Sequence, residues 1–298
     1  MKLKLTILLL IVSNLFAKAQ SLPVFHLEGD SCSFHFLQDK QYVFIEGSIG
    51  PVKGKFMFDT GSEEALSINS LYVHLTGAKK IGTGFNGTGE HYDVLQLDTV
   101  RDVQIGNYVI PISGPAKMSE QKGIQEHLMP DFLGLIGYNF FKGYIFKLDY
   151  QRHILTFYKS YSPPEKDILS VIDFFTAKET NHPLVKVDIG GILFTAEFDT
   201  GQPGTFYPMD SAKTALLQKN LLSAPNDNSE SSLTAVKLSG GLTVNLNYLH
   251  VRPHDAANAM KKSIGITDDN MIGFGYGFLS QFVTVWDYDQ HKIYLLKP

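Results

Sequence analysis

The chain has 298 residues, of which 44% are hydrophobic and 19% are charged. This composition excludes a globally disordered chain and leaves room for one large domain or two ordinary ones. The formal net charge is −4 with both signs mixed along the sequence, which argues against nucleic acid or an anionic membrane as a partner.

The N-terminal segment, residues 1–19, has the pattern of a secretory signal peptide. Two lysines precede an apolar run, and Ala17 and Ala19 form the small-residue pattern of a cleavage site. The run has about twelve residues and a membrane-spanning helix needs roughly 20, so cleavage is favoured over a membrane anchor. We expect an exported mature chain that begins at Gln20 and is periplasmic or secreted. Its single cysteine, Cys32, excludes an internal disulfide.

The first half of the mature chain predicts strands around an Asp-Thr-Gly motif. The stretch 42–61, YVFIEGSIGPVKGKFMFDTG, is typical of two strands joined by a tight glycine-containing turn, the second running into the motif. A short helix is expected at 69–77 and a glycine-rich hairpin at 82–97. Residues 133–159 then predict further apolar strands.

The second half repeats this order. Residues 183–201, PLVKVDIGGILFTAEFDTG, again predict two strands that run into Asp-Thr-Gly. A helix is expected at 209–222, a second glycine-containing hairpin at 233–246, and a closing apolar segment at 270–297.

The near-constant spacing between these segments indicates a duplicated unit. The interval along the chain from Asp59 to Asp199 is almost the same as the interval from Asp149 to Asp287. Aligning Gly137 with Gly273 gives an interval that again agrees within a few residues. An offset that varies so little over a whole unit predicts two homologous domains.

The boundary between the two units is predicted at residues 161–167, YSPPEKD, where prolines and charges interrupt the pattern. We therefore expect an N-terminal lobe at 20–160 and a C-terminal lobe at 168–298. Most segments predict strands, so the expected fold class is mainly β.

Two further polar segments, DYQRH at 149–153 and DYDQH at 287–291, lie between apolar strands. They are interpreted as hairpin turns with solvated side chains rather than as catalytic groups.

Two aspartates at equivalent positions of two related lobes predict one shared site. A pseudo-twofold axis between the lobes would bring Asp59 to face Asp199. Two carboxylates a few Å apart cannot both ionise freely, so the pair holds a single proton. Such a pair suits water-mediated amide cleavage, in which one member takes a proton from water and the other donates a hydrogen bond to the carbonyl oxygen.

The residues after each aspartate have supporting roles in this interpretation. Gly61 and Gly201 allow backbone N–H groups to approach the carboxylates closely. Thr60 and Thr200 carry hydroxyls that could reach across the lobe interface.

The doubled motif resembles that of the aspartic peptidase clan, the pepsin-like and retropepsin-like enzymes. The closest likeness is to bacterial exported proteins with two retropepsin-like domains in one chain. The resemblance covers nearly all of the mature sequence and includes the apolar-apolar-Gly segments at 135–137 and 271–273. It implies two β-barrel-like lobes with a substrate cleft between them, and an aspartic endopeptidase with Asp59 and Asp199 as catalytic pair. It also implies that Thr60 and Thr200 form a cross-lobe brace.

The same resemblance implies a hairpin, the flap, that folds over the substrate. In the first lobe the candidate is the hairpin at 82–97, with its tip at Gly87, Thr88 and Gly89 and with Tyr92 as the candidate tyrosine. Glycine-rich tips permit tight turns and hinge motion. Both half-sites lie in one chain, so a monomer is expected. Neither a metal nor an organic cofactor is expected, because the chain has no Cys/His metal spacing.

The motifs differ at their next residue, which is Ser62 in one copy and Gln202 in the other. Ser62 fits the family pattern, and its hydroxyl is expected to donate to Asp59 and to favour the ionised form. Gln202 departs from the pattern and would need a different geometry. We therefore hypothesise that Asp59 is the ionised base and Asp199 the proton carrier.

This departure leaves two alternatives to a monomeric peptidase. The chain could be a peptide-binding protein on a peptidase scaffold without turnover, because fold alone does not secure function. Alternatively, each lobe could pair with its copy in another chain.

Overall fold

The computed structural model describes residues 25–85, 91–110, 115–177, 180–189, 191–206, 221–224, 227–238, 241–251, 254–268 and 270–298. Within these ranges the chain is mainly β with a few short helices, which confirms the predicted fold class at that level. The signal-peptide segment 1–19, the flap tip Gly87, Thr88 and Gly89, and most of the helix expected at 209–222 lie outside the described residues.

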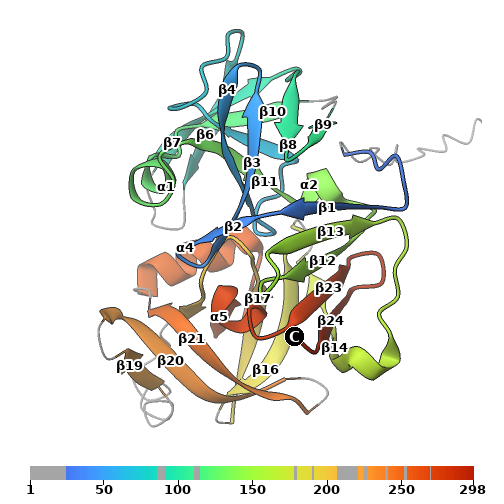
Figure 1. The fold of residues 1–298 in the computed structure, drawn as a ribbon. Coiled ribbons are helices and arrows are strands. Elements are labelled where there is room, and N and C mark those ends of the chain that lie inside the picture. The colour runs from blue at the N-terminus through green and yellow to red at the C-terminus, as the bar shows by residue number, and fades with distance from the viewer. Residues whose placement is uncertain are drawn as a thin grey trace, which may run out of the picture.

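The first sheet holds the first Asp-Thr-Gly motif and appears at the top of Figure 1. Its order is β6-β7-β10-β5-β11-β4-β3-β8-β9, with β2 paired to β3. The strands are β2 (Leu37–Asp39), β3 (Tyr42–Ile49), β4 (Val52–Phe58), β5 (Leu66–Asn69), β6 (Lys79–Phe85), β7 (His91–Leu97), β8 (Val103–Ile105), β9 (Tyr108–Ile110), β10 (Ala116–Ser119) and β11 (Phe132–Ile136).

The second sheet holds the second motif and lies at the bottom of the same view (Figure 1). Its order is β15-β16-β17-β22-β18-β21-β20-β19, and β16 also pairs with β20. The strands are β15 (Phe175–Thr176), β16 (Pro183–Ile189), β17 (Ile192–Phe198), β18 (Thr205–Phe206), β19 (Leu221–Ala224), β20 (Asp227–Lys237), β21 (Thr243–Val251) and β22 (Met271–Phe274).

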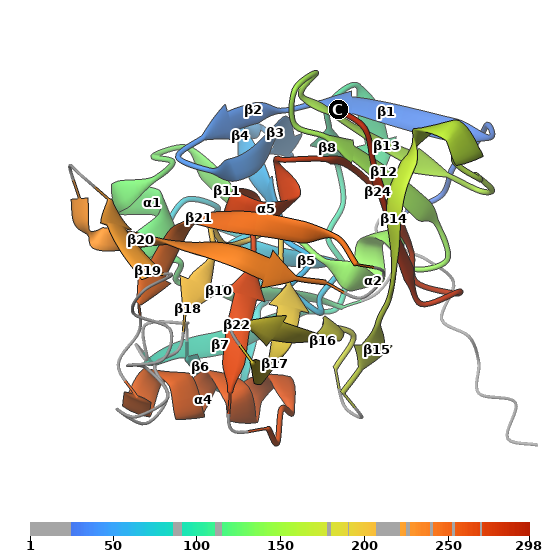
Figure 2. The same cartoon turned by 90° about the horizontal axis from the view of Figure 1, so that it is seen from below.

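A third sheet of six strands joins the two halves, and Figures 1 and 2 both place its strands side by side. Its order is β1-β13-β12-β23-β24-β14. The halves meet where β12 pairs antiparallel with β23, with Phe146 opposite Trp286. The strands are β1 (Ser31–His35), β12 (Ile145–Asp149), β13 (Ile154–Tyr158), β14 (Ile168–Asp173), β23 (Val283–Asp287) and β24 (Lys292–Leu296).

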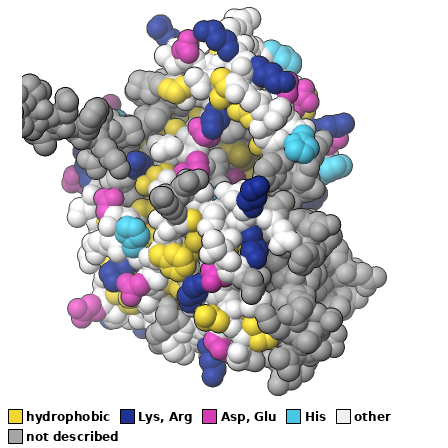
Figure 3. All heavy atoms as spheres, turned by 180° about the vertical axis from the view of Figure 1, so that it is seen from behind, with side chains coloured by type: hydrophobic (Ala, Val, Ile, Leu, Met, Phe, Trp, Pro, Cys, Tyr) yellow, Lys and Arg dark blue, Asp and Glu magenta, His cyan; other side chains and the backbone are white. Residues whose placement is uncertain are grey.

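The helices of the described residues are short. They are α1 (Lys122–His127), α2 (Tyr138–Phe141), α4 (His254–Ile264), α5 (Tyr276–Leu279) and the 3-10 turn η1 (Glu165–Asp167). None of them is long and apolar enough to cross a membrane. Figure 3 shows that the face seen from behind carries Lys or Arg and Asp or Glu side chains interspersed, as the mixed charges of the sequence suggested.

The helix expected at 69–77 is absent from the structure, so that prediction is wrong. Asn69 is fully buried, and its carbonyl accepts hydrogen bonds from Tyr72 and Val73. Its side-chain oxygen accepts the N–H groups of Leu71 and Gln121. A buried Asn that binds the backbone in this way favours a turn over a helix.

The two polar segments form hairpin turns between β12 and β13 and between β23 and β24, as predicted. The prediction of solvated side chains is wrong for the aspartates. Asp149 and Asp287 are buried, and each accepts the backbone N–H three residues further on. They therefore stabilise the turns from inside the fold.

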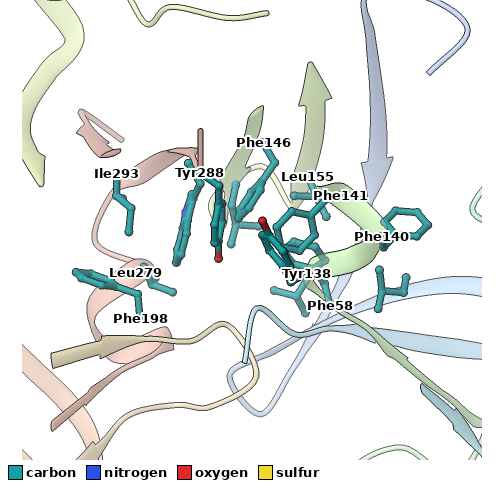
Figure 4. Packing of buried hydrophobic residues seen from close by; sticks show 14 of the residues in the cluster. Phe58, Tyr138, Phe140, Phe141, Phe146, Leu155, Phe198, Leu279, Tyr288 and Ile293 are labelled. Carbon is teal, nitrogen blue, oxygen red and sulfur yellow. The ribbon is translucent and has the colours of Figure 1, made fainter. Parts of the chain in front are cut away.

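The core runs through the shared sheet from one half to the other (Figure 4). Phe58 and Phe198, which precede the two aspartates, are both fully buried. Phe58 contacts Phe146, Phe146 stacks on Trp286 at 5.2 Å, and Trp286 contacts Phe198. This aromatic chain anchors both motif loops to one continuous core.

Candidate active site

Each aspartate follows the buried end of a strand and is fixed by a strand that lies parallel beside it. Asp59 follows β4, and its N–H donates to Ile136 of β11 at 2.9 Å. Asp199 follows β17, and its N–H donates to Phe274 of β22 at 3.0 Å. The two loops thus have the same support in both halves.

The two threonines connect the loops directly. The N–H of Thr60 donates to the hydroxyl of Thr200, and the N–H of Thr200 donates to the hydroxyl of Thr60, both at 3.0 Å. The Thr200 hydroxyl also donates to the Phe58 carbonyl at 3.0 Å. Both threonines are buried, so their backbone N–H groups cannot bind water. The two cross-loop hydrogen bonds satisfy these donors instead. The structure therefore forms the brace expected between Thr60 and Thr200.

The two glycines bring the carboxyl groups together. The N–H of Gly61 donates to Oδ1 of Asp59 at 2.8 Å and to Oδ1 of Asp199 at 3.1 Å. The N–H of Gly201 donates to Oδ1 of Asp199 at 2.7 Å. A Cβ atom at Gly61 would lie 2.7 Å from the Asp199 carboxyl, and one at Gly201 would collide with the Asp59 carboxyl. Only glycine leaves space for the opposite aspartate at either position.

The electrostatics of this pair favour a retained proton. Burial raises the pKa of Asp199 well above its usual range, and the charges of Asp59 and Glu197 raise it further. Burial also raises the pKa of Asp59, while its hydrogen bond with the Asp199 side chain opposes that rise. The pair therefore keeps a proton at a pH where isolated aspartates are ionised. Both pKa values are raised, so the shared proton belongs to the pair.

Ser62 and Gln202 differ in what they contribute. Among the described residues, the Ser62 hydroxyl makes no hydrogen bond to Asp59, so that expectation is wrong; Asp59 receives the Gly61 N–H instead. Gln202 does act as a donor, from Nε2 to Oδ2 of Asp199 at 3.2 Å. The longer side chain thus serves the second carboxyl directly.

Gly273 provides the space for Gln202. A Cβ atom at Gly273 would lie 2.5 Å from Oε1 of Gln202. Strand pairing puts Gly273 of β22 opposite Glu197, and the matching position of the first half is Leu135, opposite Met57. The change from Ser to Gln is therefore accompanied by a change from Leu to Gly beside it.

This pairing also corrects the alignment of the two halves. Gly137 matches Gly275, not Gly273, because each follows the strand residue that accepts the aspartate N–H. The N–H after Gly137 donates to Ser62 O, and the N–H after Gly275 donates to Gln202 O. With this correction, the interval from Gly137 to Gly275 equals the interval from Asp149 to Asp287.

We expect Gly273→Ala to push the Gln202 amide away from Asp199 without unfolding the protein, because the contacted atoms end a flexible side chain. The cost should be about 1–3 kcal/mol of unfolding free energy, as for other overpacked sites. In a Gln202→Ser background the same change should cost close to nothing, which a double-mutant cycle measured by urea unfolding will test. An equal cost in both backgrounds would contradict the contact.

The candidate flap tyrosine does not reach the aspartates in this structure. Tyr92 lies in β7 opposite Gly84 of β6, and a Cβ atom at Gly84 would lie 2.7 Å from its ring. Burial raises the pKa of Tyr92, while the charge of Lys117 lowers it. No hydrogen bond joins Tyr92 to either aspartate within the described ranges.

Two functional candidates escaped the sequence interpretation, His182 and Glu197. The His182 Nδ1 and the Glu197 Oε1 form a hydrogen bond, and both side chains are buried. Glu197 lies two residues before Asp199 and is the single charged residue of β17, and this isolated acid was the available signal. The residue before His182, Asn181, donates from its N–H and Nδ2 to the Glu63 carboxylate at 2.5 and 2.7 Å. Glu63 follows the first motif, so this contact links the two halves beside the site.

Among the described residues, no group of three or more His, Cys, Asp or Glu side chains is arranged to hold a metal ion. Neither protein-family models nor curated proteins give a match to this chain. The functional proposal therefore depends on the motifs and on the geometry around Asp59 and Asp199.

Proposed function

We propose that the protein is an aspartic-type endopeptidase that hydrolyses peptide bonds through a water activated by Asp59 and Asp199. The observation that carries this proposal is the Gly61 N–H, which donates to a carboxyl oxygen of both aspartates. One backbone group can serve both only if the two carboxyls lie side by side. The mechanism that we propose needs neither a metal nor an organic cofactor.

In the proposed mechanism the ionised aspartate takes a proton from the attacking water. The protonated aspartate donates a hydrogen bond to the substrate carbonyl oxygen as that oxygen gains charge. The tetrahedral intermediate then collapses: the leaving nitrogen accepts the proton that the aspartate took from the water, the peptide C–N bond breaks, and that aspartate is ionised again. The Gln202 amide, which donates to Asp199, is present at only one of the two aspartates, and Gly61 and Gly201 hold the carboxyls in place.

We also infer the finer architecture from the resemblance to pepsin-like and retropepsin-like enzymes. In this proposal the two sheets belong to two related lobes, 20–160 and 168–298, with the substrate cleft between them. The threonine brace and the strands β11 and β22 beside the two motifs support it. A monomer is proposed because both half-sites belong to one chain. Export after cleavage at residue 19 and a flap with its tip at 87–89 remain part of the proposal.

The test is cleavage of a defined peptide mixture by the purified protein between pH 3 and 8, read by mass spectrometry. The reaction should incorporate one ¹⁸O atom from labelled water into each new carboxyl terminus. It should give no transfer product with an added amine, because no acyl-enzyme forms in this mechanism. Transfer to the amine would contradict the proposal. Tight peptide binding without any product would favour a peptide-binding protein instead.

A further inference from the structure

A second pair of charged groups lies buried beside the aspartates. In the antiparallel register of β16 and β17, Leu184 is opposite Glu197, so continuing the register brings His182 opposite Asp199. His182 is 9% exposed and Glu197 is 2% exposed. Charged groups are seldom buried this deeply unless they are paired, and the hydrogen bond between His182 and Glu197 provides that pairing.

The charge state of His182 follows from the acids around it. Burial lowers its pKa, but the charge of Glu197 and their hydrogen bond, together with Asp199 and Glu63, outweigh burial and raise the pKa to about 9. Asp59 is the fourth acid that interacts with it. At neutral pH the pair is therefore an imidazolium beside a carboxylate.

The pair is confined to one side of the site. The residues of the first half at the same places relative to Asp59 are Met57, for Glu197, and Tyr42, for His182. Met57 carries no charge, and Tyr42 has a phenol where the second half has an imidazole. At these two described positions, the half that supplies Asp199 has a buried pair of charged groups and the other half does not.

The two charges act on the two aspartates in opposite ways. For Asp199, the negative charge of Glu197 raises the pKa and outweighs the lowering by His182. For Asp59, the positive charge of His182 lowers the pKa and outweighs the rise due to Glu197. This sign difference agrees with the position of Glu197 on the strand that leads into Asp199.

We propose that the His182–Glu197 pair makes the two aspartates unequal, because it holds the shared proton on Asp199 and the negative charge on Asp59. His182 and Glu197 are then positioning residues for the reaction and do not touch the substrate. This inference rests on the proposed peptidase function. Physically, an asymmetric pair of acids loses its first proton at lower pH and its second at higher pH than a symmetric pair.

The experiment replaces the pair with the neutral, hydrogen-bonding double variant His182→Gln/Glu197→Gln. The pH range in which kcat/KM is high should become narrower. The acid limb should shift to higher pH and the alkaline limb to lower pH, each by about half a pH unit or more. Glu197→Gln alone should lower the alkaline limb. Lys186→Gln is the matched control, since Lys186 lies on β16, the strand that follows His182, but pairs with Asp268 at the surface; its profile should be that of the wild type.

A readout without turnover separates this inference from the proposed function. In protein labelled with ¹³C at the aspartate carboxyls, Asp59→Asn and Asp199→Asn identify the two resonances. Near neutral pH the wild type should give one protonated and one ionised shift, and the double variant should bring them closer together. Unchanged shifts in a folded double variant would overturn the inference even if the protein cleaves peptides. Converging shifts in a protein without cleavage would retain it and reject the peptidase.

Discussion

Replacing Asp59 or Asp199 with Asn is expected to lower kcat/KM for peptide cleavage by about a hundredfold to ten-thousandfold. Each change removes one of the two proton-transfer groups, and general acid–base catalysis of this kind contributes about 10²–10⁴-fold per group. The loss should be similar for both variants because neither carboxyl can do the work of the other. Initial rates on a peptide identified as a substrate provide the measurement.

The loss should occur without loss of stability. Both aspartates have raised pKa values in the folded protein, so their stabilising effect is complete below the unfolded pKa near 4 and is lost as pH rises through the folded values. At neutral pH the Asn variants should therefore unfold at the same urea concentration as the wild type or a higher one. Asp98→Asn, at a surface position where the side chain is 85% exposed, is the matched control and should retain full activity. Full cleavage by either dyad variant would end the proposal.

Replacing Thr200 with Val is expected to destabilise the protein by about 2–4 kcal/mol. The change leaves the buried N–H of Thr60 and the buried carbonyl of Phe58 without their partner. Each buried unsatisfied group costs about 1–3 kcal/mol. Thr60→Val removes a partner only from the Thr200 N–H and should cost about half as much.

Thr200→Ser is the control for this prediction, because it keeps the hydroxyl and removes only a methyl group. Its unfolding free energy in urea should stay within about 1 kcal/mol of the wild type. If the two Val variants were equally stable, the additional hydrogen bond from Thr200 to Phe58 would have no energetic role.

Much of the site could be predicted from the sequence because its central motif, Asp-Thr-Gly, occurs twice in the chain. The duplicated Asp-Thr-Gly motif predicted that Asp59 and Asp199 meet and that Thr60 and Thr200 join the loops. The motif is local, and each copy follows an apolar strand, so its surroundings are fixed by neighbouring residues. Those contacts are present in the structure.

The alignment of Gly137 failed because the segment around Gly273 has glycine at every second position, Gly273, Gly275 and Gly277. Two registers then match equally well, and only the pairing of Phe198 with Phe274 decides between them. The role of Gln202 could not be predicted for the same reason. The correct register is needed to see that Gly273 leaves space for the Gln202 side chain.

The His182–Glu197 pair could not be predicted from spacing. Glu197 lies on β17 and His182 directly precedes the neighbouring strand β16, so their contact depends on where the turn between β16 and β17 falls. A single charged residue in a strand such as β17 signals that a partner exists but does not identify it. The Ser62 hydroxyl is a similar case, because the sequence does not fix the direction of a short side chain in a loop.

The shared sheet of six strands has a consequence for synthesis of the chain on the ribosome. β24, at residues 292–296, lies between β23 and β14, so the sheet has a gap until that segment has been made. A nascent chain that already contains both Asp-Thr-Gly motifs thus lacks the last strand to be made of the sheet in which its halves meet. We therefore expect the aspartates to reach their final geometry only after residue 296 has been translated. In the proposed peptidase, this order would keep proteolysis from starting while the chain is still being made.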